Sequence, residues 1–222
     1  MQKIGLIGGT GDIGSALAVH LAKKNEEVLI GSRSKEKAES ALRDILKDKK
    51  GRKDLEEHLK AVMNEVVAST CDVVIFTVPY SVAIETITKL QSEFKGDQLL
   101  ISTVAAIEKS GNEFVPIRNR ISISRNIQEI VPKSMHVATA FQTIPARVLY
   151  KEEKIDADVL VCCDEQSTYS RTAGIISSIE GLRPLYTGTL DLSLEIEGLT
   201  AILLNISIHE HLKSPTFKIK SF

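Results

Sequence analysis

The chain has 222 residues, of which 43% are hydrophobic and 26% are charged, and its formal net charge is −1. These values are typical of a folded domain with at most a small extension, and they give no reason to expect nucleic acid or an anionic membrane surface as a partner. The first residues lack the pattern of a signal peptide, no apolar run approaches the length of a membrane span, and the three cysteines show no C-x-x-C spacing. We therefore expect a reduced, cytoplasmic protein.

Apolar strand-like runs alternate with amphipathic helix-like runs along the chain. Near the N-terminus, Ile13, Ala16, Leu17, His20 and Leu21 recur at the spacing of one helical face. Further helices are predicted at 34–48, 82–94, 170–179 and 190–211. Strands are predicted at 3–7, 27–30, 59–63, 71–78, 98–103, 135–141, 158–162 and 182–186. This alternation favours an α/β fold with a doubly wound, mostly parallel sheet of the Rossmann type.

A glycine-rich motif, G-x-G-x-x-G, follows the first predicted strand directly and opens the first predicted helix. It consists of Gly9, Thr10, Gly11, Asp12, Ile13 and Gly14. One glycine allows a tight turn, the next lets the backbone approach a pyrophosphate, and the third lets the helix pack closely on the strand. The free N–H groups of the helix N-terminus then face the phosphates. We interpret the motif as a dinucleotide site.

The end of the second predicted strand indicates which dinucleotide binds. An NAD site usually carries Asp or Glu there, which accepts hydrogen bonds from the ribose hydroxyls. This chain has Ser32 and Arg33 at that point, and Lys37 follows Arg33 by one helical turn. A hydroxyl and two cations suit a 2′-phosphate, so NADP is favoured over NAD.

Two other patterns receive structural interpretations. His209 and His211 would point to different sides of a helix, so we expect no metal site there. Tyr150 and Lys154 form the Y-x-x-x-K pattern of short-chain dehydrogenases, but the Asn-Ala-Gly element and the glycine spacing of that class are missing. We interpret this segment as a charged surface helix.

No evident acid–base group accompanies the dinucleotide motif. Dehydrogenases that act on alcohols need such a group for the hydroxyl proton. Hydride exchange between two rings does not, because the protein can act by stacking the rings and excluding water. The residues alone therefore suit ring-to-ring hydride transfer, and they also suit a nucleotide-binding protein without turnover.

Six segments resemble, in the same order, the NADPH-dependent reductases of coenzyme F420, a 5-deazaflavin. They read IGLIGGTGDIG, IGSRSKEKA, TVPYSVAIET, AFQTIPA, GLRPL and TAILLNI. The resemblance covers nearly the whole chain and is far more specific than the glycine motif. It implies reversible hydride transfer between NADP(H) and F420 by a cytoplasmic homodimer. It also implies an NADP-binding Rossmann domain at 1–146 and a small α/β C-terminal domain at 147–222 that closes the deazaflavin site.

The resemblance further implies roles for particular residues. The pyrophosphate would contact Thr10, Asp12 and Ile13, and the 2′-phosphate would contact Ser32, Arg33 and Lys37. The nicotinamide side would be lined by Thr77, Val78 and Pro79, and the two rings would meet at Ile144, Pro145 and Ala146. Phe217 would help to close the second ring's pocket. No catalytic proton donor is expected, since the reaction would depend on positioning.

The chain departs from the family on the acceptor side. Gln142 stands where the family commonly has His, residues 105–116 follow the family loosely, and the usually glycine-rich stretch before the C-terminus reads HEHLKSPTFKIKSF. Glutamine keeps a donor and an acceptor but does not titrate. Two alternatives therefore stay open: an NADPH-dependent flavin or ferric reductase of the same fold, and a non-catalytic NADP-binding regulatory protein.

Overall fold

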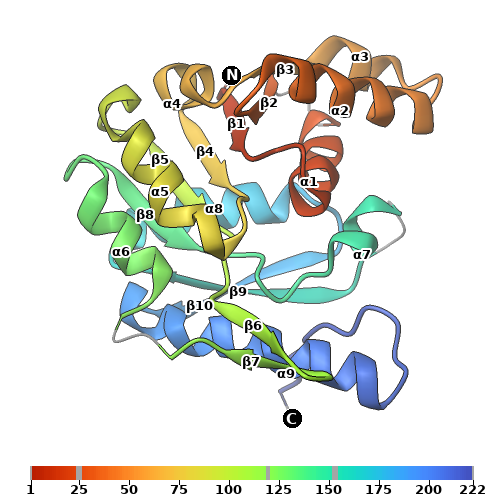
Figure 1. Ribbon diagram of the computed structural model, residues 1–222, viewed down its shortest axis with the longest axis vertical. Helices are drawn as coiled ribbons and strands as arrows, with labels where there is room; N and C mark the ends of the chain where they lie inside the picture. Colours follow the sequence, from red (N-terminus) through yellow and green to blue (C-terminus); the bar gives the residue numbers. More distant parts are fainter. Residues whose placement is uncertain (1, 24–26, 119–120, 152–154, 222) are drawn as a thin grey trace.

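The computed structural model describes residues 2–23, 27–118, 121–151 and 155–221, and it is built on one eight-stranded sheet (Figure 1). β9 (Ala157–Cys163) joins β8 in the antiparallel direction, and β10 (Leu182–Gly188) runs parallel to β9 at the edge. The other strands are parallel and lie in the order β3 (Leu59–Met63), β2 (Val28–Ser32), β1 (Ile4–Ile7), β4 (Val73–Phe76), β5 (Leu99–Ser102) and β8 (His136–Thr139). The predicted α/β fold with a mostly parallel Rossmann-type sheet is confirmed.

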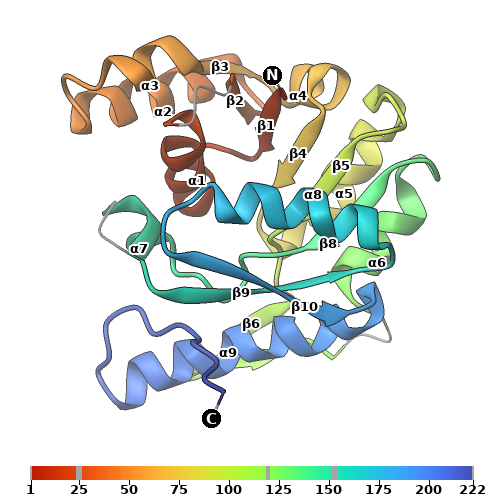
Figure 2. The ribbon, with the colours of Figure 1, turned by 180° about the vertical axis from the view of Figure 1, so that it is seen from behind.

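Helices cover both faces of this sheet because the central strands bury side chains in both directions. In β4, Val73 and Ile75 belong to one core while Val74 and Phe76 belong to the other. The first face, across which α8 lies in Figure 2, carries α1 (Asp12–Ala22), α2 (Lys35–Asp48), α3 (Lys53–His58), α7 (Ala146–Tyr150) and α8 (Gln166–Ser177). The second face carries α4 (Asn64–Thr70), α5 (Tyr80–Leu90), the 3-10 turn η1 (Gln91–Glu93), α6 (Ile123–Ile130) and α9 (Ser193–His209).

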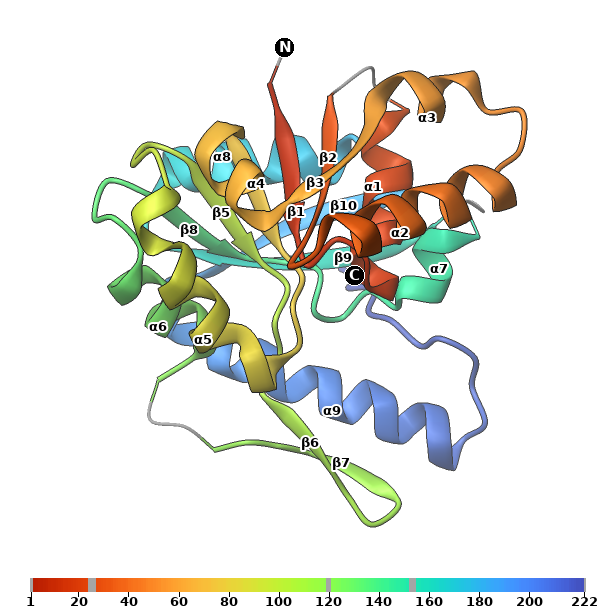
Figure 3. The same cartoon turned by 45° about the horizontal axis from the view of Figure 1, so that its top comes forward.

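α9 follows the 3-10 turn η2 (Leu190–Leu192) and supports a hairpin that lies outside the main sheet. The hairpin consists of β6 (Ile107–Ser110) and β7 (Glu113–Pro116), which lie beside α9 (Figure 3). The backbone N–H of Phe114 donates to Asn205 Oδ1 at 2.7 Å, and Asn205 Nδ2 donates to the Phe114 carbonyl at 2.8 Å. One amide side chain on α9 therefore fixes the position of the hairpin.

After α9 the chain turns back and packs against the two outer strands. Asp158 on β9 is fully buried and accepts two hydrogen bonds from Arg183 on β10, each 2.7 Å long. These bonds hold the pKa of Asp158 below its usual value. The same carboxylate accepts the Ile219 N–H at 2.6 Å, and the Phe217 carbonyl accepts the Asp158 N–H at 2.9 Å. The tail is thereby attached to the edge of the sheet.

The predicted strands and helices are present, with ends shifted by a few residues. The weak pattern at 59–63 is β3 with those bounds. The structure adds α3, α4, α6, α7 and the β6–β7 hairpin, which the periodicity did not indicate. Three of these helices have five to seven residues, too few to show helical periodicity, and the hairpin exposes most of its residues.

The expectation that no apolar run approaches the length of a membrane span is wrong for one helical segment. Within the described residues, Leu190–His209 is the single stretch whose 20 residues and mean hydropathy of 1.2 match a membrane span by length and composition. The core helix of a folded protein passes the same test when it is mostly buried, whereas 28% of this stretch is buried; α9 packs Ile196 against Leu160 and Cys162 of β9. The sheet itself runs without a break across position 146, so the division into two domains stays a prediction.

Candidate functional site

A cavity of about 730 Å³ lies where β1, β2, β4 and β5 end. β2 and β4 flank β1, so the strand order reverses there, which opens a crevice at the carboxyl ends of a parallel sheet. Most of the predicted cofactor-binding residues line this one cavity. They are Thr10, Gly11, Asp12, Ile13, Ser32, Arg33, Lys37, Thr77, Val78, Pro79 and Ala146.

The other two motif glycines lie behind the cavity wall and bring the loop close to α1. A Cβ on Gly14 would stand 2.6 Å from Gly9 Cα and 2.9 Å from Thr77 Oγ1, closer than packed atoms allow. The left-handed turn falls on Gly8, with φ +74°, one residue ahead of the motif. Gly9 N–H then donates to the Gly31 carbonyl at 2.9 Å, which joins the loop to β2. The loop therefore presents the first turn of α1 to the cavity.

The cationic end of the cavity is formed where β2 passes into α2. Ser32 ends β2 and is buried, whereas Arg33 and Lys37 are exposed. Ser34 caps α2 by accepting the Lys37 N–H at 3.3 Å, which fixes where the helix begins. Neither cation forms an ion pair with another described residue. The charges are thus available to an anionic ligand in the cleft.

The opposite end of the cavity is apolar apart from hydroxyl groups. Thr77, Val78 and Pro79 follow β4, and the Thr77 hydroxyl donates to the Ile7 carbonyl at 3.0 Å. Facing lining residues come from the end of β5, from Ala146 and from Leu204 on α9. Such a surface suits a flat ring.

A smaller cavity of about 210 Å³ adjoins this end and shares Leu204 with it. Three of the residues predicted at the ring junction, Gln142, Ile144 and Pro145, line this smaller cavity. The fourth, Ala146, lines the main cleft. Ser214 and Pro215 form another wall, while Phe217, the residue expected to close this pocket, contributes its backbone carbonyl to Asp158.

The segment around Gln142 is held by several hydrogen bonds. Thr200 on α9 donates to the Gln142 carbonyl at 3.1 Å, and Gln142 Nε2 donates to the Ser102 carbonyl at 3.1 Å. Phe141, the preceding residue, has a φ of +71°, which costs energy in a residue other than glycine. Gln142 Oε1 is buried and has no hydrogen-bond partner within the described structure. A buried acceptor of this kind can receive a donor from a ligand.

The sequence reasoning missed two polar residues near the cleft. Asn64 follows β3 and accepts the Gly8 N–H at 3.2 Å; its place after a strand was the available signal. Glu197 on α9 is 1% exposed and accepts the N–H groups of Ala106 at 3.2 Å and Ile123 at 3.0 Å. Burial raises the pKa of Glu197 to about 7, although these two bonds favour the ionised form. Nothing local in the sequence marks this acid as buried.

The structure describes three of the four residues in the two patterns interpreted as structural. The Tyr150 hydroxyl donates to Asp48 at 2.8 Å, and Lys154 lies outside the described residues. His209 ends α9, and His211 lies beyond the helix. Among the residues that the structure places, no group of three or more His, Cys, Asp or Glu could hold a metal ion.

The three cysteines are buried thiols. Burial raises the pKa of Cys71 and that of Cys163 to about 11, which leaves both thiols protonated at neutral pH. The thiols therefore behave as core side chains and take no part in the cleft.

Comparison with known proteins identifies the family. The model of the family described as NADP oxidoreductase, coenzyme F420-dependent, matches residues 3–106. The F420-dependent NADP reductase of Methanocaldococcus jannaschii is 33% identical over 98% of both chains, and that of Methanothermobacter thermautotrophicus is 30% identical over 99% of this chain and 95% of the relative. A crystal structure from Arthrobacter sp., at 20% identity, matches in fold with a TM-score of 0.81 over the full length of both chains. The chain therefore belongs to the F420-dependent NADP reductase family.

Proposed function

We infer that this protein is an oxidoreductase that transfers hydride between NADP(H) and coenzyme F420. The observation that carries this conclusion is one cleft with cations at one end and a ring-sized apolar surface at the other, in a chain similar over nearly its full length to F420-dependent NADP reductases. When both molecules are bound, hydride passes between C4 of the nicotinamide and C5 of the deazaflavin.

The dinucleotide end fits NADP. The loop from Gly8 to Gly14 and the first turn of α1 leave room for a pyrophosphate, because Gly9 and Gly14 let the loop pack tightly behind the cavity wall and Gly11 places no side chain in front of it. Arg33 and Lys37 would bind the 2′-phosphate, assisted by the Ser32 hydroxyl. With the 2′-phosphate at Arg33 and Lys37, the other end of the dinucleotide, which carries the nicotinamide, would lie toward Thr77, Val78 and Pro79.

The acceptor end fits a second ring. Ala146 and Leu204 lie on the wall of the cleft, and Leu204 also lines the smaller cavity beside Gln142. We propose that the two rings meet here and that Gln142 Oε1 accepts a hydrogen bond from an N–H group of the acceptor. These residues would hold the rings face to face and exclude water, so that the chain contributes proximity and orientation.

The test is a comparison of acceptors with purified protein and NADPH. Oxidation of NADPH with F420, followed by the absorbance of both compounds, and little oxidation with FMN or a ferric chelate, is the expected result. Faster oxidation with FMN or ferric iron would indicate a flavin or ferric reductase instead. Tight NADPH binding without turnover of any acceptor would indicate a non-catalytic nucleotide-binding protein.

We also propose that the protein forms a homodimer. Supporting this, α9 and the residues after it leave large apolar side chains in water: Ile202, Ile208 and Leu212 are 51%, 37% and 52% exposed. Light scattering on the purified protein would measure the mass, and a monomer at micromolar concentration would contradict the proposal. A cytoplasmic location without a nucleic-acid or membrane partner stays a prediction.

A further inference from the structure

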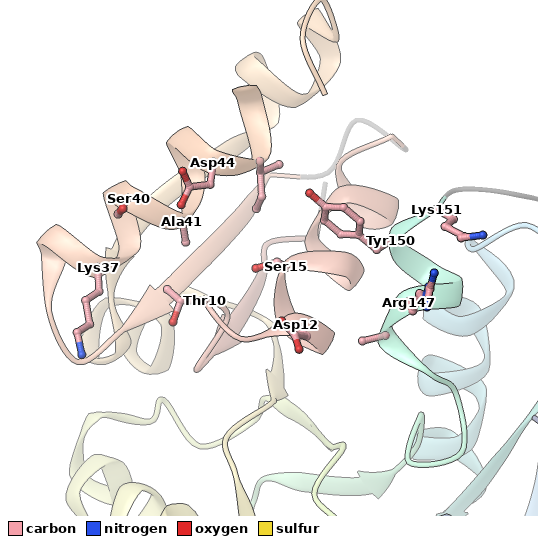
Figure 4. Close-up of a pocket in the computed structure, with 12 residues that line it drawn as sticks. Thr10, Asp12, Ser15, Lys37, Ser40, Ala41, Asp44, Arg147, Tyr150 and Lys151 are labelled. Atoms are coloured by element: carbon pink, nitrogen blue, oxygen red, sulfur yellow. The ribbon is translucent and has the colours of Figure 1, made fainter. Parts of the chain in front are cut away.

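A second large cavity, of about 760 Å³, opens beside the nucleotide cleft between α1, α2 and α7 (Figure 4). The two cavities share Thr10, Asp12, Lys37 and Ala146, so they communicate across the start of α1. In the proposed function, the dinucleotide and the two rings occupy the nucleotide cleft. The side chains that line only the second cavity are then left without a ligand.

The two long walls of this cavity differ in chemistry. α7 and the turn after it contribute Arg147 and Lys151, whereas α2 contributes Ser40 and Asp44 and, where the cavity meets the nucleotide cleft, Lys37 (Figure 4). Arg147 is exposed, and its guanidinium forms no hydrogen bond or ion pair with any other described residue. Hydroxyl and carboxylate groups bind the hydroxyls of a ligand, and arginine and lysine bind phosphate or carboxylate. The cavity thus suits a ligand with hydroxyls and several negative charges.

The position of Arg147 connects this cavity to the hydride acceptor. Ala146 lines both cavities and belongs to the proposed meeting point of the rings, and Arg147 is the next residue on α7. A substituent on a ring held at this point therefore has an exit along α7. Tyr150 closes the far end, where its hydroxyl is bonded to Asp48 and the Lys49 ammonium lies 4.7 Å from its ring centroid.

We propose that this cavity binds the polar, anionic tail of the hydride acceptor and that Arg147 is its main anion contact. The proposal rests on the proposed function. F420 belongs to the required chemical class, because its ring carries a ribityl chain, a phosphodiester and glutamyl carboxylates. Arg147 contributes affinity for the whole coenzyme and takes no part in the hydride step.

The experiment measures dissociation constants by fluorescence titration for F420 and for its fragment that retains the ring and ribityl chain only. Wild-type protein binds F420 more tightly than the fragment. Arg147→Ala weakens F420 binding about tenfold, the loss of one charge-assisted contact, and changes the binding of the fragment and of NADPH by less than about twofold. The matched control is Arg43→Ala on α2, which lies outside the cavity and pairs with Glu39 at 4.0 Å; it leaves all three constants unchanged.

Each other outcome is decisive. An Arg147→Ala variant that binds F420 as wild type does, or that loses F420 and fragment equally, overturns the tail site. Weaker NADPH binding by the same variant also overturns it, because Arg147 would then serve the dinucleotide. Wild-type protein that binds neither F420 nor the fragment contradicts the proposed function itself, whereas equal binding of both contradicts only the tail site.

Discussion

Replacement of Glu197 by glutamine tests whether the protonation of this buried acid on α9 controls the stability of the folded protein. The side chain is 1% exposed and its two oxygens accept backbone N–H groups from Ala106 and Ile123. Ala106 directly follows Val104 and Ala105, which line the nucleotide cleft. The carboxyl group thus joins α9 to the segment beside the proposed nicotinamide position.

The size of the effect follows from the pKa of Glu197. Burial raises this pKa from an ordinary value of 4.5 to about 7. Between these two pH values the folded protein keeps a proton that the unfolded chain has lost, so the free energy of unfolding falls as the pH rises. The difference in pKa, at about 1.4 kcal/mol for each unit, corresponds to a loss of about 3 kcal/mol across this window. Above the folded-state pKa no further loss is expected from this group.

Urea unfolding gives the free energy of unfolding of wild type and of Glu197→Gln at about pH 5 and about pH 8. The change between the two pH values is then compared between the two proteins. Wild-type protein should lose about 3 kcal/mol more than Glu197→Gln between the two pH values, because glutamine does not titrate. Glu195→Gln, which changes an exposed acid on the same helix, serves as the matched control and should behave as wild type. Equal pH dependence in wild type and Glu197→Gln would refute the reasoning.

Three further predictions concern single side chains. Arg33→Ala should weaken NADPH binding about tenfold more than NADH binding in parallel titrations, since only NADPH carries the 2′-phosphate; equal losses would contradict the assignment. Gln142→Leu should raise the KM for F420 about tenfold and leave the dissociation constant of NADPH unchanged, because it removes a buried acceptor near the second ring. Asp158→Asn should lower the free energy of urea unfolding by about 2 kcal/mol, since Arg183 and the Ile219 N–H lose a charged acceptor. An unchanged KM for F420 in Gln142→Leu would show that this side chain does not bind the acceptor. An unchanged urea midpoint in Asp158→Asn would show that the Asp158 charge does not stabilise the fold.

Parts of the fold whose signal is local could be predicted from the sequence. The glycine motif between a strand and a helix, and the Ser32–Arg33 pair at the end of β2, depend on neighbouring residues only. The position of the left-handed turn did not follow, because Gly8 and Gly9 are both glycines and the turn depends on bonds to distant residues, from Gly8 to Asn64 and from Gly9 to Gly31. The pattern allowed either residue.

The acceptor side was harder to predict because its contacts join distant segments. The β6–β7 hairpin has exposed, charged residues and is held by Asn205, which lies 91 positions from Phe114. The burial of Glu197 depends on Ala106 and Ile123, at separations of 91 and 74 residues. No periodicity within a window of one helix or strand reports such partners. The second cavity, likewise, depends on the packing of α7 beside α1.

These long-range bonds have a consequence for synthesis of the chain. Residues 104–123 leave the ribosome long before α9 does, so the segment beside the cleft lacks Glu197 and Asn205 until nearly the whole protein has been made. The glycine loop and β1 to β4 need no residue from α9 and can assemble earlier. We expect a nascent chain arrested before residue 193 to protect the amides of β1 and β4 from hydrogen exchange while those of the hairpin still exchange freely. Protection of both regions in the arrested chain would contradict this order, in which the glycine loop and its strands form first and the segments held by α9 form last.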